Sequence, residues 1–162
     1  MLLLLIRHAH AGDRDTDRWP DDRDRPLTDK GRKTQRRVSR ALGKLELTPT
    51  AVLTSPLARA AETAGILAEE LALSQPPIPS EALAAAPDLA RIAADIGAAG
   101  PDAIVALVGH SPWMEELAAL LLAASGSGLR IDFPKSGVMG IDLEQPARGV
   151  GELRFFLRPK MV

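Results

Sequence analysis

Short apolar runs alternate along the chain with segments whose apolar positions follow a helical period. Residues 2–6 contain no polar side chain, a pattern typical of a strand covered on both faces, as in a parallel sheet. Residues 51–54 and 103–108 are also rich in apolar residues and predict two further buried strands. Residues 138–143 and 152–157 alternate more clearly, and they predict an antiparallel or edge pair.

Helices are expected between these strands. Residues 29–45 place apolar or small side chains on one face at helical spacing, with Thr28 as a candidate N-cap. Ser55-Pro56 and Ser111-Pro112 each follow a strand and predict helix starts, because Ser is a favoured N-cap and Pro suits the first helical turn. These two helices are expected to end near residues 73 and 124.

A fourth helix is expected over residues 88–98, before Gly100-Pro101. Strands that alternate with helices predict an α/β fold, a three-layer α/β/α sandwich with a mostly parallel sheet. The length of 162 residues is expected to form a single domain, residues 1–162.

Composition and charge narrow the classes of function. The net charge is −1, with 20 basic against 21 acidic residues, so no overall field attracts the chain to nucleic acid or to a membrane surface. The sequence has no cysteine, which excludes disulfides, thiolate nucleophiles and cysteine-ligated metals. The apolar run 2–6 is too short for a spanning helix or a signal peptide, and we expect a cytoplasmic protein without nucleic-acid or membrane partners.

Charge is concentrated in residues 13–40, which hold ten basic and seven acidic residues. The first half of this segment predicts a solvated loop, and Arg14 and Trp19 lie in it. Trp19 has no evident place in a core and is a candidate rim residue. Arg14 either extends an anion site or is one more solvated charge.

Basic side chains follow three of the predicted strands. Arg7 and His8 end the first strand, Arg59 lies in the first turn of the helix after the second, and His110 ends the strand at 103–108. The carboxyl ends of parallel strands meet at one sheet edge, where ligands of α/β proteins bind. Two arginines can neutralise a phosphoryl dianion without a metal, and an imidazole among cations keeps its lone pair free for nucleophilic attack.

Each of these residues also has a plainer interpretation. Arg59 could be a surface residue paired with Glu62, three positions later on the same helix face. His110 could be a core histidine with satisfied hydrogen bonds. The combination favours a site, because all three strand ends are expected at the same edge of the sheet.

The motifs in which these residues stand resemble those of the histidine phosphatase superfamily, also called the phosphoglycerate-mutase-like family. Residues 5–8 (Leu-Ile-Arg-His) resemble its Arg-His signature, and residues 55–63 resemble its Ser-Pro-x-x-Arg-Ala-x-x-Thr motif. Residues 25–31 and 108–112 resemble two further segments in the family's order. Among its members the chain is most similar to the small bacterial phosphohistidine phosphatases, because it lacks a large lid insertion.

The resemblance implies a metal-independent phosphatase without cofactors. His8 would be the nucleophile that becomes a phosphohistidine, Arg7 and Arg59 the phosphate clamps, and His110 a donor to the phosphoryl oxygens. Glu81, after the second helix, would be the general acid, although it could be a solvated loop carboxylate. The implied substrate is a phosphorylated protein carrying phosphohistidine, and inorganic phosphate is a product.

Alternatives remain open at this point. The same chemistry could act on a small phosphate ester, or the chain could be a non-catalytic phospho-binding module. His10 could form a metal site with His8, although no carboxylate has a matching spacing.

Overall fold

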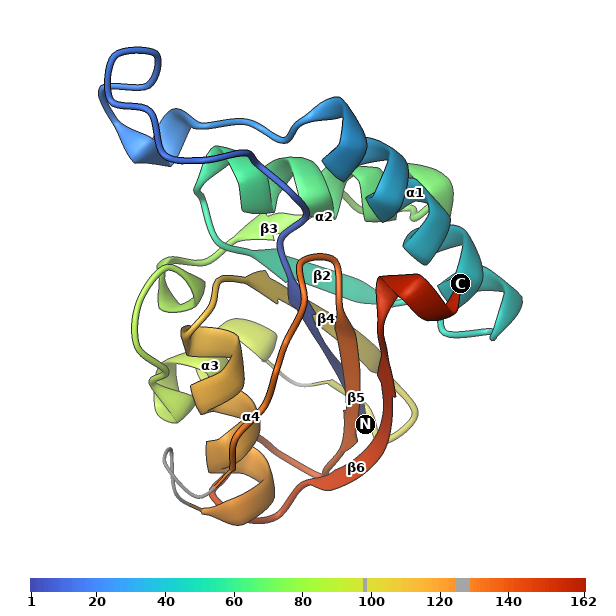
Figure 1. Cartoon of the computed structure of the whole chain (residues 1–162). Helices are drawn as coiled ribbons and strands as arrows, with labels where there is room; N and C mark the ends of the chain where they lie inside the picture. The colour runs from blue at the N-terminus through green and yellow to red at the C-terminus, as the bar shows by residue number, and fades with distance from the viewer. Residues whose placement is uncertain (98, 125–128) are drawn as a thin grey trace.

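The computed structural model describes residues 1–97, 99–124 and 129–162. In these residues six strands form one sheet in the order β3-β2-β4-β1-β5-β6 (Figure 1). The strands are β1 (Leu2–Arg7), β2 (Ala51–Thr54), β3 (Ile78–Pro79), β4 (Ile104–Gly109), β5 (Val138–Asp142) and β6 (Glu152–Leu157). The first four in chain order are parallel to one another, and β5 is antiparallel to both β1 and β6. The predicted mostly parallel sheet with an antiparallel pair is confirmed.

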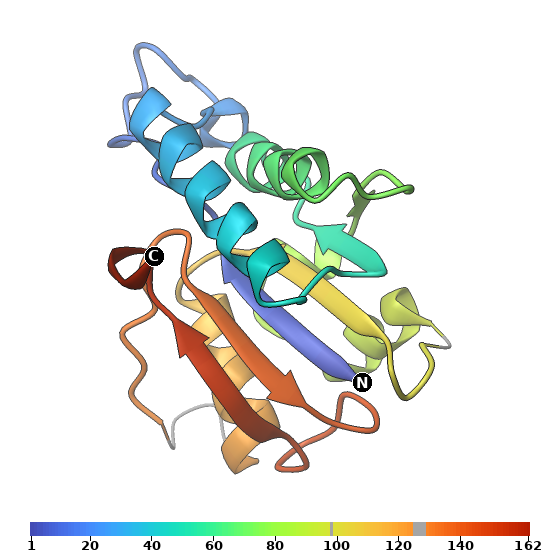
Figure 2. The same cartoon turned by 90° about the vertical axis from the view of Figure 1, so that its right-hand side faces the viewer.

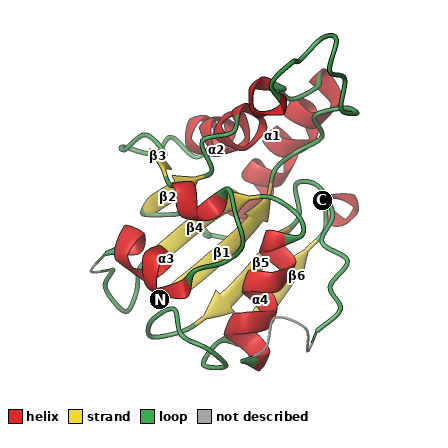
Figure 3. Ribbon diagram, turned by 90° about the vertical axis from the view of Figure 1, so that its left-hand side faces the viewer, coloured by secondary structure: helices red, strands yellow, loops and turns green. Residues whose placement is uncertain are grey.

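Four helices cover the two faces of the sheet (Figures 2 and 3). They are α1 (Asp29–Lys44), α2 (Ala58–Glu70), α3 (Leu89–Ile96) and α4 (Trp113–Ala123). Short 3-10 turns lie at Asp22–Asp24, Glu81–Leu83 and Pro159–Met161. Between α2 and β4 the described chain holds only β3, one such turn and α3 besides loops, so the predicted absence of a large insertion is confirmed.

Two hydrophobic cores lie on opposite sides of the sheet because successive side chains of a strand point to opposite faces. In β1, Leu3 and Leu5 pack with α3 and α4, whereas Leu4 and Ile6 pack with α1 and α2. All four side chains are fully buried. This two-sided burial explains why the strand has no polar alternation, and it confirms the three-layer α/β/α sandwich.

The boundaries of the helices differ from the expected ones at the Ser-Pro pairs. Thr28 caps α1 as expected, accepting a hydrogen bond from the backbone N–H of Gly31. However, α2 has Leu57 and α4 has Pro112 at the N-cap, and neither has a side-chain cap. The expected N-caps at Ser55 and Ser111 are therefore wrong by two residues and by one residue, which is the usual uncertainty of helix ends.

One further helix boundary differs from the expectation, and two short elements were not predicted. The helix expected over residues 88–98 spans Leu89–Ile96 with Asp88 as its N-cap, and residue 98 lies outside the described residues. The sequence did not predict the short strand β3 or the 3-10 turn at Asp22–Asp24. Neither segment has an apolar period that could reveal it.

Candidate active site

The end of β1 presents His8 at the carboxyl edge of the parallel strands. Arg7 is the last residue of the strand and pairs with Gly109 of β4, and the backbone N–H of His8 donates to the carbonyl of Gly109 at 2.9 Å. The His8 Nδ1 lies 2.7 Å from the carbonyl oxygen of Ala9. Since a carbonyl only accepts, Nδ1 carries the proton and Nε2 keeps its lone pair.

Two arginines flank this imidazole from different elements. Arg7 donates from Nη1 to the carbonyl of Phe133 at 2.6 Å. Arg59, in the first turn of α2 as predicted, donates from Nη1 to the carbonyl of Asp22 at 2.8 Å. A backbone carbonyl orients each guanidinium group, and a carbonyl does not neutralise its positive charge.

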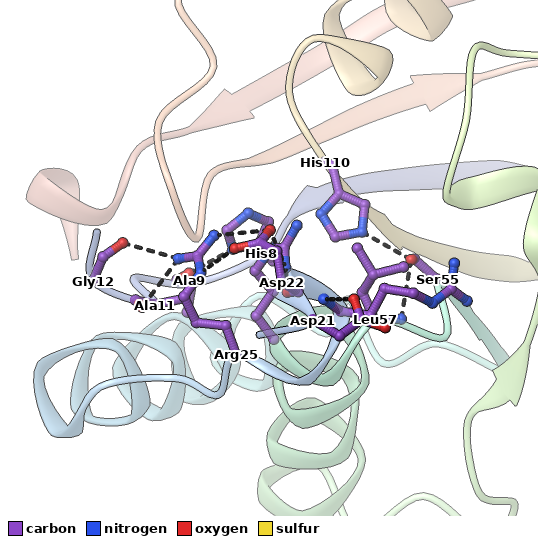
Figure 4. A network of polar contacts seen from close by, with 12 residues as sticks. His8, Ala9, Ala11, Gly12, Asp21, Asp22, Arg25, Ser55, Leu57 and His110 are labelled. Atoms are coloured by element: carbon purple, nitrogen blue, oxygen red, sulfur yellow. Dashed lines mark hydrogen bonds and ion pairs between the residues drawn. The ribbon is translucent and has the colours of Figure 1, made fainter. Parts of the chain in front are cut away.

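His110 follows β4 and lies beside His8, with 5.1 Å between the ring centroids. Its Nε2 is 2.8 Å from the hydroxyl of Ser55, which also accepts from the backbone N–H of Leu57 (Figure 4). Ser55 therefore orients this histidine instead of capping α2. The structure brings together Arg7, His8, Arg59 and His110 from three strand ends, and we call these four side chains the anion cup.

Burial keeps both histidines of the anion cup neutral. Desolvation, with smaller contributions from His110, Arg59 and Arg7, lowers the pKa of His8 to about 3. Desolvation and the charge of Arg59 lower the pKa of His110 to about 4. At neutral pH the cup thus holds two uncharged imidazoles between two guanidinium cations.

Several buried polar atoms of this region have no hydrogen-bond partner within the described residues. They are Arg7 Nε, Arg59 Nε, His110 Nδ1 and Ser136 Oγ. Buried polar groups normally have partners, so a group of exceptions at one place requires an explanation. Arginine donors and neutral imidazoles arranged in this way suit the several oxygens of a tetrahedral oxyanion.

Sequence reasoning missed the turn that covers Arg59. Asp22 lies 3.4 Å from Arg59 through a carboxylate oxygen, and it also accepts from Arg25 Nε at 2.8 Å. Arg25 donates in addition to the carbonyls of Ala11 and Gly12 (Figure 4). The hydrogen bond from Arg25 lowers the pKa of Asp22, so this carboxylate stays ionised beside the cup. The ion pair expected as an alternative for Arg59 is wrong, because Glu62 pairs with Arg32 of α1 at 2.8 Å.

The remaining candidates lie at the rim. The carboxylate of Glu81 is exposed and 3.6 Å from Arg23, next to Asp22. Arg14 is exposed, and its charge contributes to the lowered pKa of Asp22. Trp19 is half-buried and lines a cavity of about 620 Å³ beside the loop 11–19, with Arg18 over its ring at 5.5 Å.

His10 is fixed by the loop that follows β1. Its Nδ1 accepts from the backbone N–H of Gly12 at 3.2 Å and is 3.0 Å from the hydroxyl of Thr28. Within the described ranges, no group of three or more His, Cys, Asp or Glu side chains is arranged to hold a metal ion. No helix in the same part of the chain is long and apolar enough to cross a lipid bilayer.

A neutral histidine beside two arginines at the carboxyl edge of a parallel sheet suits a phosphoryl group, because the arginines can neutralise its charge. The family model of the histidine phosphatase superfamily (branch 1) matches residues 3–85. The chain belongs to this superfamily, and the resemblance of its motifs is confirmed. Membership supports a phosphatase activity.

Individual proteins are also similar to this chain. An uncharacterised protein of Picosynechococcus sp. is 37% identical over 143 residues, which cover 87% of this chain and 84% of that protein. The protein histidine phosphatase SixA, solved in complex with tungstate, superimposes with a TM-score of 0.81 at 23% identity over 99% of both chains. A mycobacterial glucosyl-3-phosphoglycerate phosphatase superimposes with a TM-score of 0.68 at 20% identity, over 95% of this chain and 97% of that one. These two structures share the fold, and they act on different substrates according to their names.

Proposed function

We propose that this protein is a metal-independent phosphatase that removes phosphate from protein phosphohistidine through a covalent phosphohistidine on His8. One observation carries the proposal. His8 is neutral and buried in the anion cup, near the charges of Arg7 and Arg59, and the carbonyl of Ala9 holds the proton on its Nδ1. The two arginines neutralise the dianion that this nitrogen attacks.

The first step forms a bond between His8 Nε2 and phosphorus while the bond to the leaving nitrogen breaks. A substrate phosphohistidine that is protonated on its second ring nitrogen leaves as neutral imidazole. In the second step water attacks phosphorus, the phosphorus–Nε2 bond breaks, and dihydrogen phosphate leaves. His8 returns to its neutral form with the Nδ1 proton in place. Arg7, Arg59 and His110 contact the phosphoryl oxygens as their charge shifts in both transition states.

The protonation states of the cup favour a nitrogen leaving group. An alkoxide leaves poorly without a proton donor, yet the pKa values of His8 and His110 are about 3 and about 4. Asp22 is held ionised by Arg25. Glu81 remains the candidate acid for an ester substrate, and its exposed carboxylate pairs with Arg23 at the rim.

The test compares a phosphohistidine peptide with small esters such as a sugar phosphate. Wild-type protein should turn over the peptide with the higher kcat/KM, and excess EDTA should leave the rate unchanged. His8→Ala should lose at least about 10³-fold in rate while its circular dichroism and unfolding curve match the wild type. Wild-type protein quenched in alkaline detergent should carry an alkali-stable, acid-labile phosphate that His8→Ala lacks.

Three results would overturn the proposal. Appreciable turnover by His8→Ala would show that His8 is not the nucleophile. Faster turnover of the ester, lost in Glu81→Gln, identifies a phosphomonoesterase with Glu81 as its acid. Tight binding of phosphate without turnover of any of these compounds identifies a phospho-binding module.

A further inference from the structure

The segment 133–136 is held directly against the end of β1. The backbone N–H of Ser136 donates to the carbonyl of Arg7 at 3.0 Å and to that of His8 at 3.3 Å. The carbonyl of Phe133 accepts from Arg7, and the Phe133 ring is buried against Phe156 at a centroid distance of 5.0 Å. These contacts fix the backbone of Lys135 beside the nucleophile.

Lys135 stands among cations without a carboxylate partner. Its side chain is half-buried, and no carboxylate of the described residues lies within 4.0 Å of its ammonium group. In the same residues, carboxylates pair instead with arginines and with the amino terminus. Desolvation, followed by the charges of Arg7 and Arg25, lowers the pKa of Lys135. Asp13, an exposed residue, is the carboxylate whose charge opposes this shift. A half-buried ammonium among cations is unfavourable unless an anion compensates it.

His10, two residues after His8, supplies a hydrogen-bond donor. Because its Nδ1 accepts from Gly12, the neutral ring carries its proton on Nε2. This N–H has no hydrogen-bond partner within the described residues. After desolvation, Lys135 is the largest cause of the lowered pKa of His10, ahead of Lys30. The geometry agrees with this, because Ser136, next to Lys135, bonds the carbonyl of His8, two residues before His10. Both residues therefore border the place where β1 continues into the loop.

We propose that Lys135 and His10 form a second anion subsite beside the anion cup, which binds a carboxylate side chain next to the phosphohistidine of the substrate protein. The ammonium supplies charge and the imidazole N–H supplies a directed hydrogen bond, a combination that suits a carboxylate. The subsite rests on the proposed function, because it selects among the phosphoproteins presented to His8. It also gives a role to His10, which no step of the reaction uses.

The experiment uses phosphohistidine peptides that differ at one position. Each carries a single Glu at −2, −1, +1 or +2 from the phosphohistidine, and each has a matched Gln peptide. At one or more positions the wild type should prefer the Glu peptide by about tenfold in kcat/KM, as expected for one partly exposed charge pair. Lys135→Gln should reduce that preference to less than about twofold, and Lys135→Arg should restore most of it.

The matched control is Lys33→Gln on the exposed side of α1, which should leave kcat/KM unchanged for both the Glu and the Gln peptides. An equal loss on Glu and Gln peptides in Lys135→Gln would overturn the subsite, because Lys135 would then act on the phosphoryl group itself. An unchanged preference would overturn it as well. If Lys135→Gln weakens inhibition by pyrophosphate much more than inhibition by phosphate, without changing the peptide preference, the second anion is a small-molecule phosphate and the carboxylate assignment is wrong.

The two proposals fail in different ways. Turnover of the Gln peptides by wild-type protein tests the phosphohistidine phosphatase alone. The Glu-to-Gln ratio tests the subsite alone, since it is defined only once turnover exists. If the wild type turns over no peptide, inhibition of ester hydrolysis by pyrophosphate still reports whether Lys135 binds an anion.

Discussion

Arginines occupy two regions of this molecule and have different partners in each. On the outer side of α1, Arg40 donates to Glu70 at 2.6 and 3.1 Å, and Arg32 donates to Glu62 at 2.8 and 3.1 Å. In the anion cup, Arg7 donates to a carbonyl of the backbone. A carboxylate cancels the charge of a guanidinium, whereas a carbonyl orients the group and leaves its charge available to a ligand. The same residue type thus stabilises a helix pair in one region and prepares an anion site in the other.

The largest expected effect comes from exchanging one arginine in each region. Arg7→Gln should lower kcat/KM for a phosphohistidine peptide by about 10²–10³-fold, the loss typical of one transition-state donor. Arg40→Gln should stay within about twofold of the wild type. Steady-state kinetics and tungstate titration by calorimetry measure both variants. Similar losses in the two would mean that the regions do not differ in function.

Acid should destabilise the protein through the two histidines of the anion cup. The unfolded chain takes up protons on its histidines near pH 6.5, whereas folded His8 and His110 resist protonation until about pH 3 and about pH 4. The unfolded state therefore binds more protons within this window, and stability falls as the pH falls. Between pH 6.5 and 4.5 the free energy of unfolding should drop by on the order of 2 kcal/mol per histidine.

Urea unfolding at several pH values measures this change. His110→Asn should show a smaller fall over the same window than the wild type. Long-range ¹H–¹⁵N spectra should show neutral imidazoles for both residues at pH 5. A flat stability curve, or an imidazolium signal at pH 5, contradicts the environment described for the cup.

Asp22 places a carboxylate beside Arg59 of the anion cup, so the cup is not wholly different from the paired arginines of α1. Removal of this carboxylate should increase the difference between the two regions. Asp22→Asn takes away an ionised group that lies 3.4 Å from Arg59, so tungstate should bind about tenfold more tightly. Asp24→Asn, in the same exposed turn, is the control and should bind tungstate as the wild type does. Weaker binding by Asp22→Asn would show that this carboxylate positions Arg59 more than it competes for it.

The smallest effect is expected on α1. Glu70→Gln removes the partner of Arg36 and Arg40, and exposed ion pairs contribute little to stability. The Tm should fall by at most about 4 °C, with unchanged kcat/KM, as measured by calorimetry and peptide turnover. A loss of activity would link α1 to the site.

Most of the fold could be predicted from regular patterns of apolar residues along the chain. The apolar run of β1 and the spacing of Val38 and Leu42 in α1 follow directly from burial against the sheet. The four residues of the anion cup could be anticipated because they stand at strand ends and in motifs. Their catalytic roles remain predictions that the experiments above test.

Residues in irregular segments could not be predicted in this way. Asp22 and Arg25 lie in a highly charged stretch in which many residues could have formed ion pairs beside Arg59. Only the folded path of the chain shows that these two do. Lys135 and Ser136 precede β5 with no motif around them. Ser55 was predicted as a cap from its residue type, but its hydroxyl bonds His110 because the helix begins later. Local sequence does not encode which distant backbone lies opposite.

The hydrogen bonds from segment 133–136 to the end of β1 also bear on protein synthesis. Phe133 lies 126 residues after Arg7, so a nascent chain already contains the four residues of the anion cup before the carbonyl that orients Arg7 leaves the ribosome. Products of premature termination after α4 retain the sequence motifs but lack this contact. Assembly of the anion cup therefore waits until nearly the whole polypeptide has been synthesised.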